Sequence, residues 1–298
     1  MNLGYACINT VLSANKIMTN RTMRRKTFDA QGIDYVSDLA LLNVKDLKTI
    51  VQWNNEMKIK LFRLSSQIFP WSDEYDIKTL KDYKEISKIM LEVGQIAKDG
   101  GQRLTMHPGP YNCLASPTQK VVDKTVRELN FNSEQFNMMG YDPSPYNKIN
   151  IHVGGAYGDK KSTLARFVQN FSLLNDDAKK RLVIENDDSP NEYSVKDLFD
   201  GIFQNIGIPI TFDYFHHKFN TGDLTEEQAL KMASITWPEG IAQCCHYSES
   251  RRKEKLDESI RPQAHSDIIY EKIQTYGLEP DIVIEAKMKE QAIFKRPI

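Results

Sequence analysis

The stretch Arg181-Leu182-Val183-Ile184-Glu185-Asn186-Asp187-Asp188 joins a short apolar run to an abruptly acidic end. Leu182, Val183 and Ile184 are consecutive apolar residues, which is typical of a strand buried on both faces of a parallel sheet. Glu185 follows at the carboxyl end of that strand, where α/β proteins place their functional side chains. The stretch therefore predicts a buried parallel strand that delivers an acid to a site.

Other short apolar segments also end in a side chain that can bind a metal ion. Their ends lie at His107, His152, Asp213, His246 and Glu285. The carboxyl ends of the strands of a barrel open on one face, so we expect these side chains to meet there. Any one histidine alone is more simply explained as a structural or surface residue, but packing does not explain such convergence.

The chain alternates short apolar strands, polar loops and amphipathic helices, which is typical of a parallel sheet with helices outside. We expect strands at about 3–8, 59–65, 103–107, 148–153, 182–185, 210–213, 241–246 and 281–285. We expect helices at about 34–55, 79–98, 162–174, 194–205, 225–234, 261–276 and 286–292, and another that Ser116 caps. Eight strands, each followed by a helix, predict an α/β fold, a TIM (β/α)8 barrel forming a single domain over 1–298. An open, doubly wound sheet is the main alternative, and the strand count argues against it.

The composition restricts the class of protein. The chain has 298 residues, a net charge of −1 and 40% hydrophobic residues, so we expect a sizeable core rather than disorder. No apolar run approaches the ~18–20 residues that span a bilayer, and no secretory signal is evident, so we expect no membrane association. The four cysteines lack CxxC spacing, which favours an intracellular, reducing compartment. The net charge gives no global sign of nucleic-acid binding but does not exclude it.

Imidazole nitrogens and carboxylate oxygens together are the ligand set of zinc, manganese or iron(II). The candidate ligands are His107, His152, Glu185, Asp213, His216, His246, His265 and Glu285. One ion needs three or four protein ligands, so eight candidates indicate two or three ions with bridging carboxylates at the carboxyl face of the strands. We expect Asn186, Asp187 and Asp188 to orient ligands or to cap a helix rather than to bind metal.

Basic residues follow several of the expected strands and should lie on the same face as the candidate ligands. They are Arg21, Arg24, Arg25 and Lys26, then Lys160 and Lys161, then Lys218, and finally Arg251, Arg252 and Lys253. Each cluster alone is ordinary solvated charge, but their shared face favours a polyanionic substrate. Aromatic residues, Tyr5 and Tyr111 among them, should collect on this face, where they can stack on exposed bases.

A set of motifs covers nearly the whole chain. The motifs are Gly4 to Asn9, Arg63 to Ser66, His107-Pro108-Gly109, His152 to Gly155, Glu185 to Asp188, Asp213 to His217, His246-Tyr247-Ser248, His265-Ser266-Asp267 and Asp281 to Lys287. Their combination and order resemble the UV damage endonuclease family. The resemblance implies a TIM barrel related to endonuclease IV that acts on double-stranded DNA carrying UV lesions. It implies a nick immediately 5′ of cyclobutane dimers, 6-4 products and abasic sites, which leaves a 3′-hydroxyl and a 5′-phosphate.

The resemblance also implies a cofactor and a ligand assignment. Divalent metal ions are required, with Mn²⁺ first and Zn²⁺ or Mg²⁺ as alternatives, and the family's chemistry needs only a monomer without an obligate protein partner. Glu185 and Glu285 would bridge ions as catalytic acids. The remaining ligands would pair as His107 with His152, Asp213 with His246, and His216 with His265. Among the basic residues, Lys160 and Arg251 are our candidates for contacts with DNA.

Further roles follow from the same motifs. Tyr5 and Asn9 would lie near the scissile phosphate or the flipped lesion. Tyr111 matches the aromatic half of the family's probing pair, which wedges into the duplex where the damaged dinucleotide leaves the stack.

The sequence departs from the family pattern in three places. Pro110 stands where the probing pair has a glutamine, and Cys244 stands where some members carry a modified lysine. Many members also carry a histidine shortly after the motif that begins at Arg63. The segment from Gln67 to Tyr75 contains none here, so an acid within it would have to substitute or the position is unused.

Two other functions stay open at this point. A xylose-isomerase-like sugar isomerase would share the barrel and the metal face, but it would not need the basic loops. A catalytically inactive barrel that only binds damaged DNA would not need eight metal ligands. Activity on small ketoses would favour the isomerase, whereas a purified protein without metal would favour the inactive binder.

Overall fold

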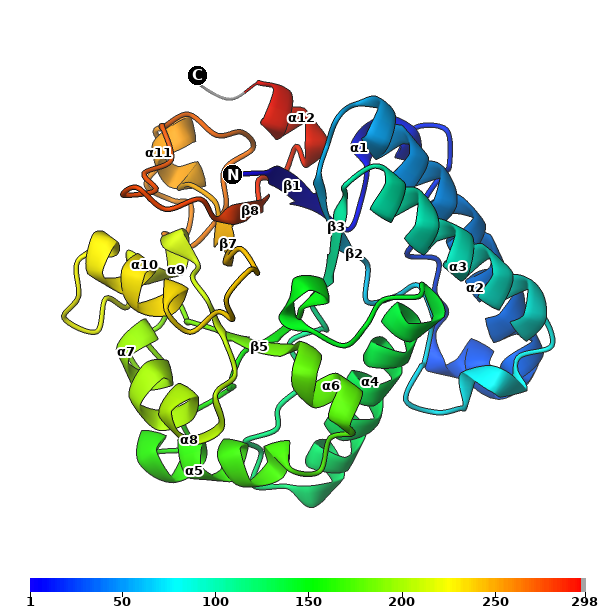
Figure 1. Ribbon diagram of the computed structural model, residues 1–298, viewed down its shortest axis with the longest axis horizontal. Coiled ribbons are helices and arrows are strands. Elements are labelled where there is room, and N and C mark those ends of the chain that lie inside the picture. Colours follow the sequence, from blue (N-terminus) through cyan, green and yellow to red (C-terminus); the bar gives the residue numbers. More distant parts are fainter. Residues whose placement is uncertain (296–298) are drawn as a thin grey trace.

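The strands of the sheet are short and pair in parallel (Figure 1). The computed structural model describes residues 1–295. The strands are β1 (Leu3–Ala6), β2 (Leu61–Leu64), β3 (Arg103–Met106), β4 (Ile149–Ile151), β5 (Leu182–Glu185), β6 (Ile210–Thr211), β7 (Cys244–Tyr247) and β8 (Asp281–Ile284). Their order in the sheet is β6-β5-β4-β3-β2-β1-β8-β7, so strands consecutive in sequence are neighbours and β8 returns beside β1.

The two edge strands of this sheet, β6 and β7, meet and bring the sheet close to a full barrel. An isolated parallel bridge joins Asp213 to His246, and the His246 amide donates to the Phe212 carbonyl at 2.9 Å. We call this junction the β6–β7 seam. The parallel strands therefore form the predicted TIM barrel, and the alternative of an open doubly wound sheet is wrong.

Helices surround the strands, as the ring of ribbons in Figure 1 shows. The α-helices are α1 (Thr10–Ser13), α2 (Arg25–Glu56), α3 (Tyr83–Asp99), α4 (Gln119–Met138), α5 (Lys160–Phe171), α6 (Asp176–Arg181), α7 (Val195–Leu198), α8 (Gln204–Ile206), α9 (Tyr214–His217), α10 (Glu226–Ser234), α11 (Arg251–Lys255) and α12 (Glu290–Phe294). Two 3-10 turns, η1 (Ile77–Thr79) and η2 (Pro145–Asn147), and a π-helical turn, η3 (Phe199–Phe203), join them. Within residues 1–295, no helix is both long and apolar enough to cross a bilayer.

The helices α2 and α3 lie side by side over one flank of the barrel (Figure 1). Val44 and Leu47 of α2, and Met90 and Val93 of α3, are fully buried and recur at the three-residue spacing of one helix face. The predicted helix over 34–55 is confirmed, but α2 begins earlier, at Arg25. A kink at Gly32, whose φ is 66°, separates that first part from the predicted part.

The predicted helix over 261–276 is wrong. That segment is irregular, and the helix after β7 is the short α11. The reason is a competition for backbone donors. The carboxylate of Glu249 accepts the amides of Tyr270 and Glu271, and the carboxylate of Glu254 accepts the amide of Asp267. In a helix these amides would donate to carbonyls four residues earlier.

Smaller corrections concern helix boundaries. Ser116 does not cap a helix: its hydroxyl accepts the amide of Thr118, and α4 begins only at Gln119. The predicted helix over 194–205 consists of α7, η3 and α8, and the one over 286–292 starts at Glu290. The single domain over 1–298 stays a prediction, and its residues 296–298 lie outside the described part of the chain.

Candidate metal centre

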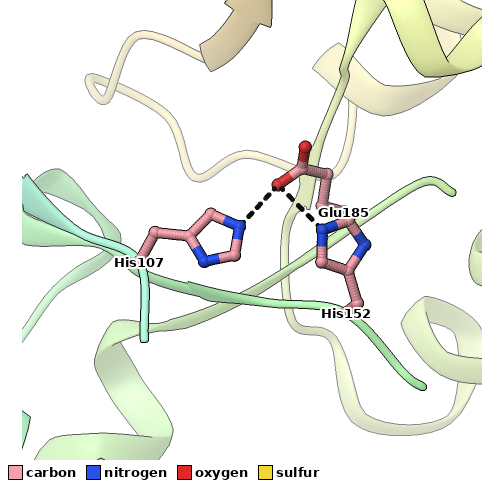
Figure 2. A group of neighbouring side chains, drawn as sticks. All are labelled: His107, His152 and Glu185. Carbon is pink, nitrogen blue, oxygen red and sulfur yellow. Dashed lines mark ion pairs between the residues drawn. The ribbon is translucent and has the colours of Figure 1, made fainter. Parts of the chain in front are cut away.

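Glu185 ends β5 at the carboxyl face of the barrel and is 1% exposed. One of its oxygens, Oε2, lies 3.3 Å from His107 Nε2 and 3.7 Å from His152 Nε2. Figure 2 shows both imidazoles directed at this carboxylate. The other oxygen, Oε1, lies 3.0 Å from His246 Nδ1 and 3.5 Å from His216 Nδ1. Four histidines, from β7 and from the segments that follow β3, β4 and β6, therefore converge on one carboxylate.

Two groups of side chains around Glu185 could each hold a metal ion. In each group, one ligand atom per residue lies within 4.8 Å of the others. His107 and His152 form the first group with Glu185, and Asp213 and His216 form the second with the same glutamate. The structure thus brings together five of the eight predicted ligands in two groups that share one acid. Imidazole nitrogens with carboxylate oxygens suit zinc, manganese or iron(II).

The other three predicted ligands lie beside these groups. His246 Nδ1 is 3.4 Å from Glu285 Oε1, and His265 Nδ1 is 3.7 Å from Glu285 Oε2. Arg63, in β2, forms an ion pair with Glu285. Burial alone would raise the pKa of Glu285, but the Arg63 charge opposes burial and holds the pKa below its ordinary value. Glu285 thus already has a protein cation as a partner, whereas Glu185 has imidazoles.

Most of the histidines have one ring nitrogen fixed and the other available. The Nδ1 atoms of His107, His216 and His265 donate to the backbone carbonyls of Pro108, Asn186 and Glu285, at 2.9, 2.8 and 3.1 Å. A hydrogen bond at Nδ1 fixes the tautomer and leaves Nε2 as the ligand atom. This arrangement is the one expected of metal-binding histidines.

His152 and His246 are held by charged side chains instead. His152 Nδ1 lies 2.7 Å from Asp187 Oδ1, so Asp187 has the orienting position expected from the sequence. His246 Nε2 lies 3.0 Å from Nζ of Lys148, a lysine that is fully buried just before β4. His246 therefore presents Nδ1, rather than Nε2, to the carboxylates of the cluster.

The pKa values of two cluster residues are raised, for different reasons. Burial by itself lowers the pKa of His152, but the charges of Glu185 and Asp187 outweigh burial and raise it to about 10. Burial raises the pKa of Asp213 to about 6, with the charges of Glu185 and Glu285 adding to the effect. Asp213 Oδ2 is also buried without a hydrogen-bond partner among the described residues. An orphaned carboxylate oxygen facing such a ligand set fits a bound cation.

A pocket of ≈400 Å³ opens above the cluster. Its lining combines candidate ligands with residues of the loops that follow the strands. These include His107, Pro110, His152, Asp187, His216 and His265. The pocket gives a substrate access to both candidate metal groups from the carboxyl face.

Tyr5 and Asn9 are buried away from solvent. The Tyr5 hydroxyl donates to Asn54 Oδ1 at 2.8 Å and accepts from Asn9 Nδ2 at 3.0 Å. Asn9 Oδ1 also accepts the amide of Leu12 and so caps α1. In this structure both residues brace the start of the chain, and their predicted contact with a substrate stays a prediction.

Of the predicted DNA-binding residues, Pro110 and Tyr111 lie in the loop after β3, whereas Lys160 and Arg251 begin α5 and α11. Tyr111 is 88% exposed, and Pro110 beside it is exposed as well. Lys160 Nζ lies 3.3 Å from Asp197, and Arg251 Nη1 lies 3.8 Å from Asp267. The two basic residues are thus already near acids, whereas Tyr111 projects freely into solvent.

Sequence reasoning missed three residues that touch the cluster: Arg63, Lys148 and Asn150. Asn150 donates from Nδ2 to Glu185, and Lys148 Nζ also lies 3.4 Å from the carbonyl of Cys244. Cys244 is one of the departures from the family pattern. The ammonium group of Lys148 lies beside this position. Arg63 and Asn150 lie inside β2 and β4, and Lys148 directly precedes β4, so the available signal was a charged or amide residue within or beside an apolar strand.

Comparison with known proteins agrees with this geometry. A family model described as UV-endonuclease UvdE matches residues 1–296. A UV-damage endonuclease of Schizosaccharomyces pombe is 37% identical over 98% of the chain, which spans 49% of that relative's length. The crystal structure of SacUVDE superposes with a TM-score of 0.83, at 28% identity, over 98% of this chain and 95% of the other.

A likeness to sugar epimerases is one of fold alone. D-psicose 3-epimerase from Clostridium cellulolyticum superposes with a TM-score of 0.56 over 96% of this chain and 85% of the other. The two share only 12% of their residues, so the barrel is common to both and no activity carries over.

Proposed function

The chain belongs to the UV-endonuclease UvdE family, and from this premise we propose that it is a metal-dependent DNA-repair endonuclease. Its substrate is double-stranded DNA carrying cyclobutane dimers, 6-4 products or abasic sites. It nicks the backbone immediately 5′ of the lesion and leaves a 3′-hydroxyl and a 5′-phosphate. It acts as a monomer and needs no obligate protein partner. The observation that carries the proposal is the pair of ligand groups sharing Glu185 at the mouth of the barrel.

Two or three divalent ions fit the residues present, with Mn²⁺ as the first candidate. His107, His152 and Glu185 would hold one ion, and Asp213 and His216 would hold another with Glu185. The unpartnered Oδ2 of Asp213 supports this assignment. When bound, such ions supply the positive charge that polarises the scissile phosphodiester and stabilises the attacking and leaving oxygens.

The side chains of the cluster arrange the site around the phosphate. Glu185 belongs to both groups and therefore sets the distance between them. His246 and His265 extend the ligand set toward Glu285, which completes the third position we propose. In the absence of an ion, the Arg63 guanidinium balances the charge of Glu285. It also holds the pKa of that carboxyl below its ordinary value, so the group stays ionised.

The rim residues would hold the damaged duplex. The Tyr111 ring is exposed, so it can wedge between base pairs where the lesion leaves the stack. Pro110 has no side-chain donor, so the bases left without partners when the lesion leaves the stack would receive only apolar contact from it. Lys160 and Arg251, which now pair with acids, would exchange those partners for DNA phosphates.

A direct test uses a duplex oligonucleotide with one cyclobutane dimer at a known position. With Mn²⁺, one product is expected, mapped to the phosphodiester immediately 5′ of the dimer, with a free 3′-hydroxyl. The undamaged duplex should stay intact, and EDTA should abolish incision until Mn²⁺ is restored. Cleavage of the undamaged duplex at the same rate, or incision unaffected by EDTA, would overturn the proposal.

A further inference from the structure

His265 belongs to an irregular segment that must be held in place from outside. Residues 256–280 connect α11 to β8 and contain no helix. Yet His265 lines the pocket above the metal centre and directs Nδ1 to the Glu285 carbonyl at 3.1 Å. Because a long irregular loop has many accessible conformations, a ligand within it is presented correctly only if other contacts fix its backbone.

Two buried or half-buried carboxylates supply such contacts: Glu254 accepts the amides of Asp267 and Ile268, and Glu249 accepts two amides further along. Glu249 lies two residues after β7 and is 1% exposed. Its Oε2 accepts the amide of Tyr270 at 2.7 Å, and its Oε1 accepts the amide of Glu271 at 2.9 Å. The Tyr247 hydroxyl donates to the same Oε1 at 2.7 Å. Three donors on one buried carboxylate make this an ordered clamp and not a surface contact.

The main chain of Glu249 and the residues after it also holds the backbone directly on both sides of His265. The amide of Ser266 donates to the Glu249 carbonyl at 2.8 Å, and the amide of Arg251 donates to the Ala264 carbonyl at 2.8 Å. An isolated antiparallel bridge pairs Ser250 with His265 itself. The backbone is therefore fixed immediately before and after His265, and the carboxylate clamp fixes it again five residues later.

We propose that Glu249 is a positioning residue that sets His265 for metal binding by clamping the backbone of residues 264–271. This inference rests on the proposed function, since His265 is a ligand only if the centre binds metal. Glu249 itself does not touch the candidate ions or the pocket. It acts through the backbone that carries His265, in the way that outer hydrogen-bond partners orient metal ligands elsewhere.

The clamp requires a carboxylate and not merely a polar side chain. Both oxygens of Glu249 accept hydrogen bonds from N–H or O–H groups. A glutamine keeps one oxygen and places an NH2 group against the other donor, so one amide loses its acceptor. Glu249→Gln therefore loosens the segment without changing the volume of the buried side chain.

The test measures Mn²⁺ binding to the full chain by isothermal titration calorimetry, without DNA. In Glu249→Gln, one class of Mn²⁺ sites is expected to weaken about 10–100-fold, while the tighter class binds as in the wild type. Glu271→Gln is the matched control, because it makes the same chemical change in the clamped segment at an exposed side chain. Its Mn²⁺ isotherm should match that of the wild type.

A double-mutant comparison separates positioning from a general structural effect. If Glu249 acts through His265, then adding Glu249→Gln to His265→Ala should change Mn²⁺ binding less than twofold further. Equal losses in both backgrounds, or an unchanged isotherm in Glu249→Gln, would overturn the inference. Should Glu249→Gln fail to fold, Tyr247→Phe removes one donor from the clamp. It should weaken the same class of sites by a smaller factor, and the absence of any shift counts against the clamp.

Separate measurements test the proposed function and the role of Glu249. Incision of the dimer-containing duplex by the wild type decides the proposed function. The calorimetric comparison of Glu249→Gln with His265→Ala decides the role of Glu249, because it needs only the Mn²⁺ ion and no substrate.

Discussion

Replacing Arg103 by methionine is expected to destabilise the fold by about 3–5 kcal/mol, the usual cost of leaving a buried charge without its partner. Arg103 begins β3 and is 1% exposed. Its Nη1 lies 3.1 Å from Asp281 Oδ2, and its guanidinium also donates to the carbonyls of Tyr146, Pro145 and Ala242. Methionine fills part of the volume but satisfies none of these acceptors.

Urea denaturation followed by circular dichroism measures this loss. The double variant Arg103→Met/Asp281→Leu is the informative control, because it removes the carboxylate that the single variant leaves without its guanidinium partner, while Asn2, which donates to that carboxylate, loses an acceptor. The double variant should recover part of the lost stability. A loss below about 1 kcal/mol in Arg103→Met, or a double variant less stable than the single one, would refute the argument from the buried pair.

The same variant also tests the separation of stability from function in the barrel. Arg103 lies at the amino end of β3, whereas His107 follows the carboxyl end of that strand. In a TIM barrel the first face serves stability and the second carries the site. At a temperature where Arg103→Met is folded, its Mn²⁺ isotherm should therefore match the wild type. A weakened isotherm would show that the two faces are coupled.

Three further predictions concern the site and its surroundings. Glu185→Gln should slow incision of a dimer-containing duplex at least about a hundredfold. It should also weaken Mn²⁺ binding more than Glu285→Gln does, because only Glu185 belongs to both ligand groups. Equal isotherms for the two variants would contradict the shared-ligand model. Tyr111→Ala should keep the melting temperature of the wild type, since the ring is 88% exposed. Fluorescence anisotropy in EDTA should show that it binds damaged duplex more weakly, by the ~1–3 kcal/mol of one stacked base. Unchanged affinity would remove Tyr111 from the interface. Burial raises the pKa of Glu128 above its ordinary 4.5, so the folded state gains from this group below that pH and loses the gain as pH rises through the folded pKa. Glu128→Gln should therefore melt above the wild type at pH 7 and lose that advantage near pH 4, as differential scanning fluorimetry can measure.

Local sequence patterns predicted the elements whose cause is local. The apolar run at Leu182 to Glu185 gives a strand with those bounds, and Thr225 with Gln228 forms the expected capping box at the start of α10. The helix over 261–276 failed because its competitor is distant in sequence. Glu249 and Glu254 accept amides 13 to 22 residues away, and no periodicity within the segment reveals them.

The candidate ligands could be predicted from barrel geometry. The residues that contact and orient those ligands could not. A residue at the carboxyl end of any barrel strand reaches the same face, so the sequence alone was enough to group His107, His152 and Glu185. Lys148 reaches His246 by crossing the interior of the barrel from β4 to β7. Such contacts depend on which inward side chains meet across the barrel, and a single sequence does not contain that pairing.

The β6–β7 seam has a consequence for the local opening of the barrel. Its bridge joins Asp213 and His246, which are both proposed ligands, so metal ions bound at the cluster would hold β6 and β7 together where the described residues form no strand ladder. A ligand present at a hundred times its dissociation constant makes the state that cannot bind it about a hundredfold rarer. Metal supply would then govern how often the barrel opens, and amide hydrogen exchange near residues 210–213 and 244–247 would report the metal load of the protein.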